Sequence, residues 1–168
     1  MTETVSCGGV VIHKGKVLLL YKNQSGKSIG WVLPKGTVEE NESFRQTAVR
    51  EVHEEARVYA KVLKAIGTTQ YSFKTAQDVI FKTVHWYLMT SQSFHCKPLL
   101  EEHFADAGFY KKHEAYHLLR YNDEKQIIIK AYEEYDQIRS RPRPKSGSRR
   151  SVSTPIPVPV PHIKANQQ

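Results

Sequence analysis

The sequence has few cysteines and no long apolar run. Cys7 and Cys96 are its 2 cysteines in 168 residues, and they form neither a CxxC pair nor the spacing of a zinc knuckle. No apolar segment reaches the length of a bilayer span, and the N-terminal residues MTETVSCGGVVIHKGK lack the basic stretch and apolar run of a secretory signal. These absences argue against a disulfide framework and a membrane protein, and we expect a cytoplasmic protein.

Acidic residues are absent from the last part of the chain. From Gln137 onward there are seven basic residues and no acidic one, so most of the formal net charge of +8 lies there and the body of the chain is close to neutral. The same segment is rich in arginine, proline and serine, and its alternating proline run from Pro155 to Pro161 favours polyproline II. The composition predicts a basic, proline-rich, disordered tail over residues 139–168.

The chain of 168 residues has the length of one domain, its hydrophobic content of 39% is enough for a single core, and we expect that domain to span residues 1–138. Val5–Ile12 and Lys16–Tyr21 are apolar or β-branched runs separated by a glycine-containing turn, which predicts an antiparallel hairpin. Asn23–Gly30 predicts a loop, and Trp31–Pro34 predicts a short extended segment that the proline ends.

Further along the chain, apolar residues recur every four positions in Asn41–Ala56, which predicts a helix. Two β-rich runs around a turn at Lys74–Asp78 predict an antiparallel pair, Tyr59–Tyr71 with Val79–Met89. After a loop at Pro98 the pattern predicts a strand, a short helix and a final amphipathic helix, over Ala105–Tyr110, His113–Leu119 and Asp123–Ile138 respectively.

The predicted helix over residues 41–56 carries an unusual group of carboxylates. Glu51, Glu54 and Glu55 are spaced at i, i+3 and i+4, which places them on one side of the helix, where like charges repel by a few tenths of a kcal/mol per pair, roughly. A hard divalent cation such as Mg²⁺ or Mn²⁺ would relieve this repulsion, and it would also bind phosphate oxygens. The ordinary alternative is a solvated acidic helix face. With a cation, the group indicates hydrolysis of a phosphorylated compound by in-line displacement.

The segment Gly36–Val58 resembles the Nudix box, G-x5-E-x7-R-E-U-x-E-E-x-G-U, where U is aliphatic, at every fixed position but one. The resemblance implies an α/β fold, namely an α/β/α sandwich around a mixed β-sheet, and an enzyme that hydrolyses phosphorus-containing acid anhydrides. It implies metal ligation by Glu51, Glu54, Glu55 and the backbone carbonyl of Gly36.

The same resemblance implies that Arg50 and Glu42 hold the loop and the helix in register. It leaves the general base open between a glutamate of the box and one on a later loop, where Glu101 and Glu102 precede the predicted late strand. The candidate catalytic residues are therefore Glu54, Glu51, Arg50 and Glu102.

Arg57 is the one departure from the pattern, since the family has glycine there. Glycine adopts the left-handed conformation of a helix cap freely, whereas arginine adopts it at a cost of about 1 kcal/mol. We therefore expect a differently shaped helix end and intact metal ligands.

Residues flanking the box resemble one branch of the family. Gly30–Gly36, reading GWVLPKG, and Lys82–Met89 are similar to segments of diadenosine polyphosphate and diphosphoinositol polyphosphate hydrolases. The candidate substrate-binding residues are Lys35 and Lys82, which would contact phosphates, and Tyr71 and His85, or Tyr87, which would stack on a base. Ordinary sheet packing is the alternative for each of them.

Three classes of function remain open. The leading one is a pyrophosphohydrolase of dinucleoside polyphosphates, such as diadenosine tetra- or hexaphosphate, with ADP-ribose, nucleoside triphosphates and inositol pyrophosphates as rival substrates. The second is an RNA 5′-end pyrophosphohydrolase, in which the basic tail would add backbone binding by counterion release. The third is a non-catalytic nucleotide sensor, or a proline-rich ligand for a partner with an aromatic groove. The oligomeric state stays open.

Overall fold

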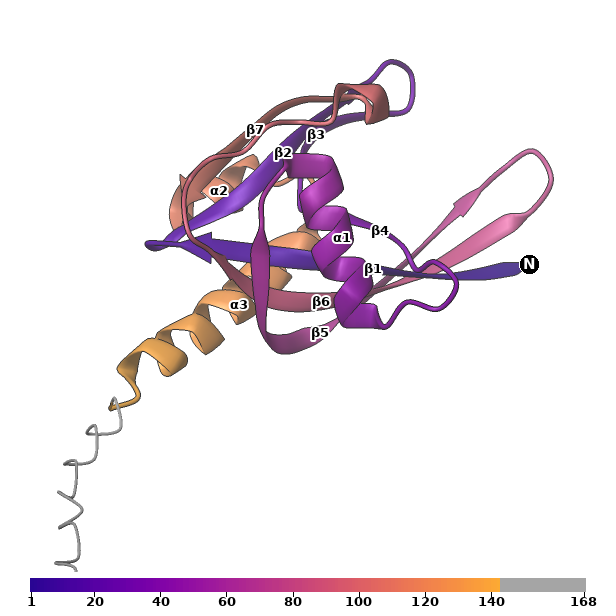
Figure 1. Ribbon diagram of the computed structural model, residues 1–168. Helices are drawn as coiled ribbons and strands as arrows, with labels where there is room; N and C mark the ends of the chain where they lie inside the picture. Colours follow the sequence, from indigo (N-terminus) through magenta and orange to yellow (C-terminus); the bar gives the residue numbers. More distant parts are fainter. Residues whose placement is uncertain (143–168) are drawn as a thin grey trace, which may run out of the picture.

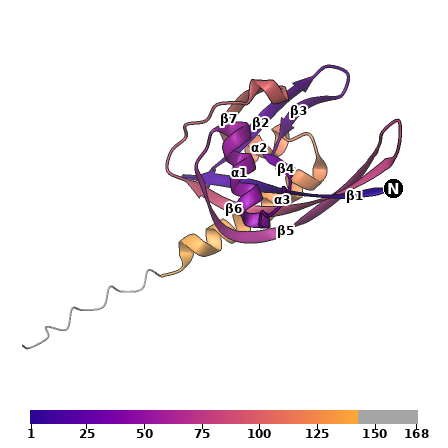
Figure 2. The same cartoon turned by 45° about the vertical axis from the view of Figure 1, so that its right-hand side comes forward.

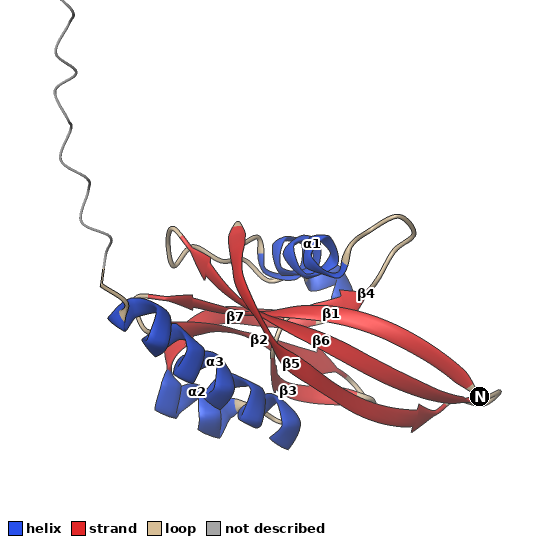
Figure 3. Ribbon diagram, turned by 90° about the horizontal axis from the view of Figure 1, so that it is seen from below, coloured by secondary structure: helices blue, strands red, loops and turns tan. Residues whose placement is uncertain are grey.

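The computed structural model describes residues 1–142, so the tail predicted over 139–168 falls largely outside the described residues. A mixed β-sheet lies between two helical layers (Figure 3). Helix α1 (Phe44–Ala56) covers one side, and α2 (Lys112–Leu118) and α3 (Asn122–Ser140) cover the other. The predicted α/β/α sandwich around a mixed sheet is confirmed.

One half of the sheet is built on β1 (Thr2–His13), which lies parallel to β6 (Val79–Ser91). The short strand β4 (Lys35–Thr37) is antiparallel to β1, and β5 (Ala60–Lys74) is antiparallel to β6. Figures 1 and 2 show the β5–β6 hairpin and the N-terminus of β1 extending together beyond the helices. The predicted pairing of the two β-rich runs is therefore confirmed.

The other half of the sheet is built on β2 (Lys16–Gln24), which is antiparallel to β3 (Ser28–Val32) and to β7 (Phe104–Lys111). β1 and β2 pair only next to their turn, at Ile12 with Val17 and His13 with Lys16. The predicted antiparallel hairpin is therefore confirmed only for the residues next to the turn. Beyond it the two strands diverge, because β6 and β4 take the hydrogen-bonding edges of β1.

The loop predicted over Asn23–Gly30 is wrong in part. Asn23 pairs with Ile29 and Gln24 with Ser28, so β2 and β3 continue through most of this segment around a tight turn. Its polar side chains are largely exposed, and a strand with little buried surface shows no apolar alternation for a sequence pattern to detect.

Alternation along β1 divides the core between the two helical layers. Val10 and Ile12 pack on the side of α3, whereas Cys7 and Val11 pack on the side of α1. Each helix therefore contacts the sheet through its own apolar cluster, and β1 contributes to both.

Helix α1 begins later than predicted and ends where predicted. Ser43 caps it, since its side chain accepts the N–H of Gln46 while the Gln46 side chain accepts the N–H of Ser43. At the other end Arg57 has φ 55° and ψ 27°, so the left-handed cap is retained. The expected change of shape is wrong, and arginine carries the cost of about 1 kcal/mol instead.

The last helix, α3, runs to Ser140 and so extends slightly past the expected domain end at residue 138. Among residues 1–142, none of the helices combines the length and the apolar character needed to cross a membrane.

Candidate functional site

The box glycine and the box helix are in direct contact. Gly36 lies on β4, and a Cβ placed on it would be 2.0 Å from Cδ of Glu51. Only a glycine leaves room for the Glu51 carboxyl group against the strand. The missing side chain thus lets β4 pack directly against the acidic side of α1.

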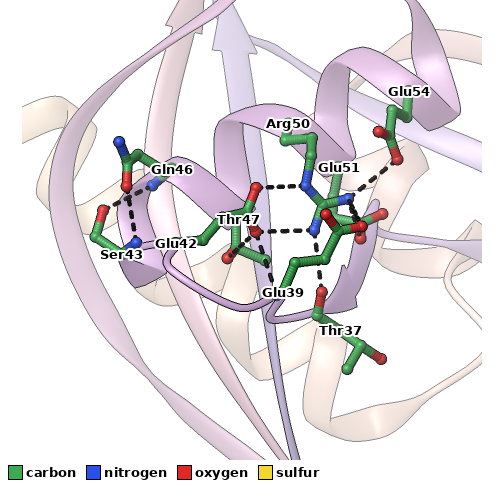
Figure 4. A network of polar contacts seen from close by, with 9 residues as sticks. All are labelled: Thr37, Glu39, Glu42, Ser43, Gln46, Thr47, Arg50, Glu51 and Glu54. Carbon is green, nitrogen blue, oxygen red and sulfur yellow. Dashed lines mark hydrogen bonds and ion pairs between the residues drawn. The ribbon is translucent and has the colours of Figure 1, made fainter.

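Arg50 fastens the segment before the helix to the helix itself (Figure 4). Its Nε donates to Oε1 of Glu42 at 2.6 Å, and its Nη2 donates to Oε2 of Glu42 and to the carbonyl of Thr37, each at 3.0 Å. Hydrogen bonds from Arg50 are the main reason that the pKa of Glu42 falls to about 2. These contacts are those of a residue that holds the loop and α1 in register.

The same guanidinium reaches two of the box glutamates. Its Nη1 donates to Oε1 of Glu51 at 2.9 Å and to Oε2 of Glu54 at 3.1 Å. The Glu51 side chain is nearly buried, and that of Glu54 is about half exposed, at 46%. In the described part of the chain, no three histidine, cysteine or acidic side chains are arranged so that they could coordinate one metal ion. Here the positive charge of Arg50 satisfies the two carboxylates.

Glu55 is the most deeply buried of the three. Its Oε2 accepts the backbone N–H of Lys35 at 3.0 Å, and 4% of the residue is exposed. Burial raises the pKa of this carboxyl well above its usual range, and the charge of Glu51 raises it further. A carboxylate this buried is costly without a cation. Gly36 lets the Glu51 carboxyl group lie against β4, and the three carboxylates are the oxygen donors that fit a hard divalent ion.

Glu102 belongs to the loop that contacts the end of α1. It ends a short 3-10 turn, Leu100–Glu102. Burial is the main cause of the raised pKa of Glu51 and of Glu55, and the negative charge of Glu102 is a smaller contribution to both. The preceding loop is bound to the end of α1, since the N–H of Leu99 donates to the carbonyl of Glu55 at 3.0 Å. The structure thus brings the predicted late carboxylate to the box helix.

A cavity of about 610 Å³ opens between the two halves of the sheet. Three of the residues predicted to bind substrate line it, namely Lys35, Lys82 and Tyr71, and Glu55 lines it as well. Burial lowers the pKa of Lys82, and the nearby charge of Lys35 lowers it further. Lys22 lines the cavity as well, so three amines lie in it beside a buried box carboxylate.

His85 lies elsewhere. On β6 it alternates with Lys82, Val84 and Trp86, so it faces α1, where its ring centroid is 4.5 Å from that of Phe44. It is not among the residues that line the cavity. The neighbouring candidate Tyr87 is buried on the same side of the sheet, in the α1 cluster.

Several residues of the cavity were not predicted from the sequence, and three of them have notable polar groups. Trp86 donates its indole N–H to Oγ1 of Thr69 at 2.9 Å, and Ser6 has a buried hydroxyl without a hydrogen-bond partner among residues 1–142. Glu124, at the start of α3, accepts the N–H of Leu33 at 2.9 Å and the Nζ of Lys35 at 3.0 Å. In the sequence an acid at a helix start indicates only a favourable helix dipole, so Glu124 gave no distinct signal.

The fold and the site together describe one class of protein. Its members are α/β/α sandwiches in which an acidic helix borders a cavity that contains lysines. The chain belongs to the NUDIX domain family, whose model matches residues 3–132.

Individual relatives agree with this assignment. The putative mutator protein MutT4 of Mycobacterium tuberculosis is 38% identical over 112 residues, which are 66% of this chain and 44% of the relative. The NAD-capped RNA hydrolase NudC of Mannheimia succiniciproducens is 32% identical over 122 residues, covering 68% of this chain and 43% of the relative. The chain therefore spans less than half the length of these curated relatives.

Among solved structures, a NUDIX hydrolase from Nitrosomonas europaea superposes with a TM-score of 0.65 at 18% identity, over 82% of this chain and 74% of that one. At this identity the likeness shows the fold alone. The Nudix resemblance is thus confirmed, while the two curated relatives carry the names of a mutator protein and a capped-RNA hydrolase. The finer resemblance to diadenosine or diphosphoinositol polyphosphate hydrolases stays a proposal.

Proposed function

We propose that this chain is a pyrophosphohydrolase that uses Mg²⁺ or Mn²⁺ to cleave a phosphoanhydride in a nucleoside polyphosphate. The observation that carries the proposal is the position of Glu55, which belongs both to the acidic side of α1 and to the wall of the cavity. A compound whose phosphates lie in the cavity therefore reaches the box carboxylates.

Glu51, Glu54, Glu55 and the carbonyl of Gly36 would hold the cation. When bound, such an ion supplies Lewis acidity at the phosphorus centre and shields the charge on the leaving phosphate. Arg50 can give up its contacts with Glu51 and Glu54 and still remain bound to Glu42 and Thr37. It then continues to orient the helix against β4.

The proton of the attacking water is assigned to a carboxylate near this centre. Glu54 is half exposed on the helix, and Glu102 lies on the adjacent loop, so either can accept a proton from water that enters from solvent. Lys35 and Lys82 would bind phosphate oxygens, and Tyr71 offers a ring at the cavity wall for a base.

Dinucleoside polyphosphates are the leading substrate in this proposal. Three lysines in one cavity, namely Lys22, Lys35 and Lys82, suit a chain of several phosphates, because each ammonium can pair with a separate oxygen group. The buried hydroxyl of Ser6 adds a polar group that a ligand could satisfy. ADP-ribose has only two phosphates and inositol pyrophosphates lack the base, whereas nucleoside triphosphates offer both features, so all three classes serve as the comparison substrates.

A second candidate is hydrolysis at the 5′ end of RNA. Two observations favour it: the name of one relative, an NAD-capped RNA hydrolase, and the concentration of basic residues after Gln137. A non-catalytic sensor is disfavoured, because Glu51, Glu54 and Glu55 are all present.

The test is product formation from diadenosine polyphosphates, ADP-ribose, nucleoside triphosphates and triphosphorylated RNA, each with Mg²⁺ or Mn²⁺. Loss of a group that takes part in proton transfer or ion binding costs about 100-fold or more in kcat, which we expect for Glu54→Gln. Glu40→Gln, at an exposed glutamate of the loop before α1, is the matched control and should retain activity. If the wild-type protein hydrolyses none of these compounds but still binds nucleotides, the proposal is wrong and the non-catalytic nucleotide sensor takes its place.

A further inference from the structure

The pair formed by Glu124 and Lys35 is the most deeply buried ion pair that the described residues form outside the box. The side chain of Glu124 is 3% exposed and that of Lys35 is 20% exposed, and 3.0 Å separates Oε1 from Nζ. Both residues line the cavity, and they lie 89 positions apart in the sequence. An ion pair buried to this degree adds little net stability compared with well-packed apolar residues. Its presence in the cavity wall therefore calls for a role other than stability.

The second oxygen of Glu124 acts on the backbone of the same segment. Oε2 accepts the N–H of Leu33 at 2.9 Å, two residues before Lys35. Lys35 itself donates its backbone N–H to Glu55, and the next residue, Gly36, packs against Glu51. The segment from Leu33 to Gly36 is therefore held by α3 on one side and by α1 on the other.

The ammonium of Lys35 has capacity left for a ligand. It has three N–H donors, and the carboxylate of Glu124 takes one of them. Its Nζ lies 5.9 Å from the ring centre of Trp86, which also lines the cavity. A lysine side chain has a flexible four-carbon stem, so a fixed partner is needed to hold the charge at one place.

We propose that Glu124 is a positioning residue: it orients the Lys35 ammonium towards phosphate oxygens in the cavity and holds the strand segment that carries Gly36. This inference rests on the proposed function for the identity of the ligand. Glu124 acts through Lys35 and Leu33 in this arrangement, since its two oxygens accept from them and its negative charge would repel a phosphate.

The first experiment compares Glu124→Gln with Glu134→Gln. Glu134 lies on the same helix and also pairs with a lysine, Lys64, at 2.6 Å, but on the surface and away from the cavity. Misplacing a positioning group costs up to about 100-fold, so we expect kcat/KM to fall 10- to 100-fold in Glu124→Gln, mainly through KM. Glu134→Gln should change it less than about twofold, in line with the small worth of surface pairs.

The second experiment separates positioning from a purely structural role. Glu124→Gln is introduced into the Lys35→Met background, and the loss in kcat/KM is compared with that in the wild-type background. If Glu124 acts through Lys35, its removal costs much less once the ammonium is absent, since the two changes share one interaction. Equal losses in both backgrounds would overturn the inference and leave Glu124 as a support for Leu33 alone.

Folding and function are controlled separately. If Glu124→Gln does not fold, the double variant Lys35→Met with Glu124→Leu, which leaves no unpaired buried charge, is compared with Lys35→Met alone. The further loss in kcat/KM should stay well below about 10-fold, since only the contact with Leu33 is removed. Should the wild-type enzyme cleave nothing in the panel, the proposed function fails, but metal-free binding of inorganic tripolyphosphate still tests the inference. Weaker tripolyphosphate binding by Glu124→Gln, with no change in Glu134→Gln, would support it, and unchanged binding would overturn it.

Discussion

At the residue scale, two glycines illustrate different reasons for lacking a side chain. Gly36 is tightly enclosed, since a Cβ would lie 2.0 Å from the carboxyl carbon of Glu51. Gly15 has open space around it but has φ +78°, in the turn between β1 and β2. The first glycine is required by packing at the site and the second by backbone conformation.

Gly36→Ala should therefore impair the site, and Gly15→Ala should not. The added methyl at position 36 displaces the Glu51 carboxyl group, and misplacement of this size costs about 100-fold in kcat/KM. Alanine at position 15 should keep activity and lose about 1 kcal/mol of unfolding free energy to left-handed strain. Kinetics and urea unfolding of both variants check this, and near-normal activity of Gly36→Ala would contradict the tight contact.

Glu42 gives a prediction about acid stability. Its pKa in the folded protein is about 2, below the ordinary value of 4.5, so the folded state binds fewer protons than the unfolded state between these values. The stabilising effect is complete above pH 4.5 and is lost as the pH falls towards 2. Glu42→Gln should thus flatten the decline of unfolding free energy in this window, whereas Glu40→Gln should leave it unchanged. Identical pH profiles for wild type and Glu42→Gln would refute the assignment.

At the scale of elements, the end of α1 carries an avoidable strain. Arg57 occupies the left-handed region with φ 55°, and its side chain is exposed. Arg57→Gly should raise the unfolding free energy by about 0.5 to 1 kcal/mol, because glycine adopts this conformation without the steric cost. Arg57→Ala removes the same side chain and keeps the strain, so thermal melts should rank Gly above both Ala and Arg. A glycine variant no more stable than the alanine variant would disprove the argument.

Elements with strong local signals were predicted well from the sequence. The every-fourth spacing of Phe44, Ala48 and Val52 gave α1 almost to its ends, and the β-rich run at Val79 gave β6. Both patterns depend on one buried face, which a single sequence displays directly. The strand β3 was half missed, since its first residues are polar or exposed.

Pairings between distant segments could not be obtained in the same way. The parallel register of β1 with β6, for example Cys7 opposite His85, depends on which edges meet in space. That register also decides that Lys82 faces the cavity while His85 faces α1. The box carboxylates could be identified from their spacing in the sequence. Glu124 could be identified only from the fold, because its partners are about ninety residues away.

At the scale of the whole molecule, charge is distributed unevenly along the chain. Of the net +8, five basic residues lie after Pro142, namely Arg143, Lys145, Arg149, Arg150 and Lys164, with no acidic residue among them. If RNA is the substrate, these residues contribute to binding mainly by releasing counterions, and they would do so without base specificity.

Truncation after Pro142 tests this contribution and leaves α3 complete. For a single-stranded RNA the slope of log K against log salt should shrink by up to about 0.7 for each phosphate that the shortened chain no longer neutralises. Hydrolysis of a small dinucleoside polyphosphate should be unaffected by the same truncation, which serves as the internal control. An unchanged salt slope would exclude the tail from RNA binding.

The parallel pairing of β1 with β6 also has a consequence for the order of biosynthesis. Chains emerge from the ribosome N-terminus first, so the acidic helix is complete at Ala56, well before the strand that flanks β1 ends at Ser91. Glu124 follows later still. A nascent chain therefore contains the three carboxylates of α1 early and the enclosing walls of its cavity late, and the cavity is complete only when α3 has been translated.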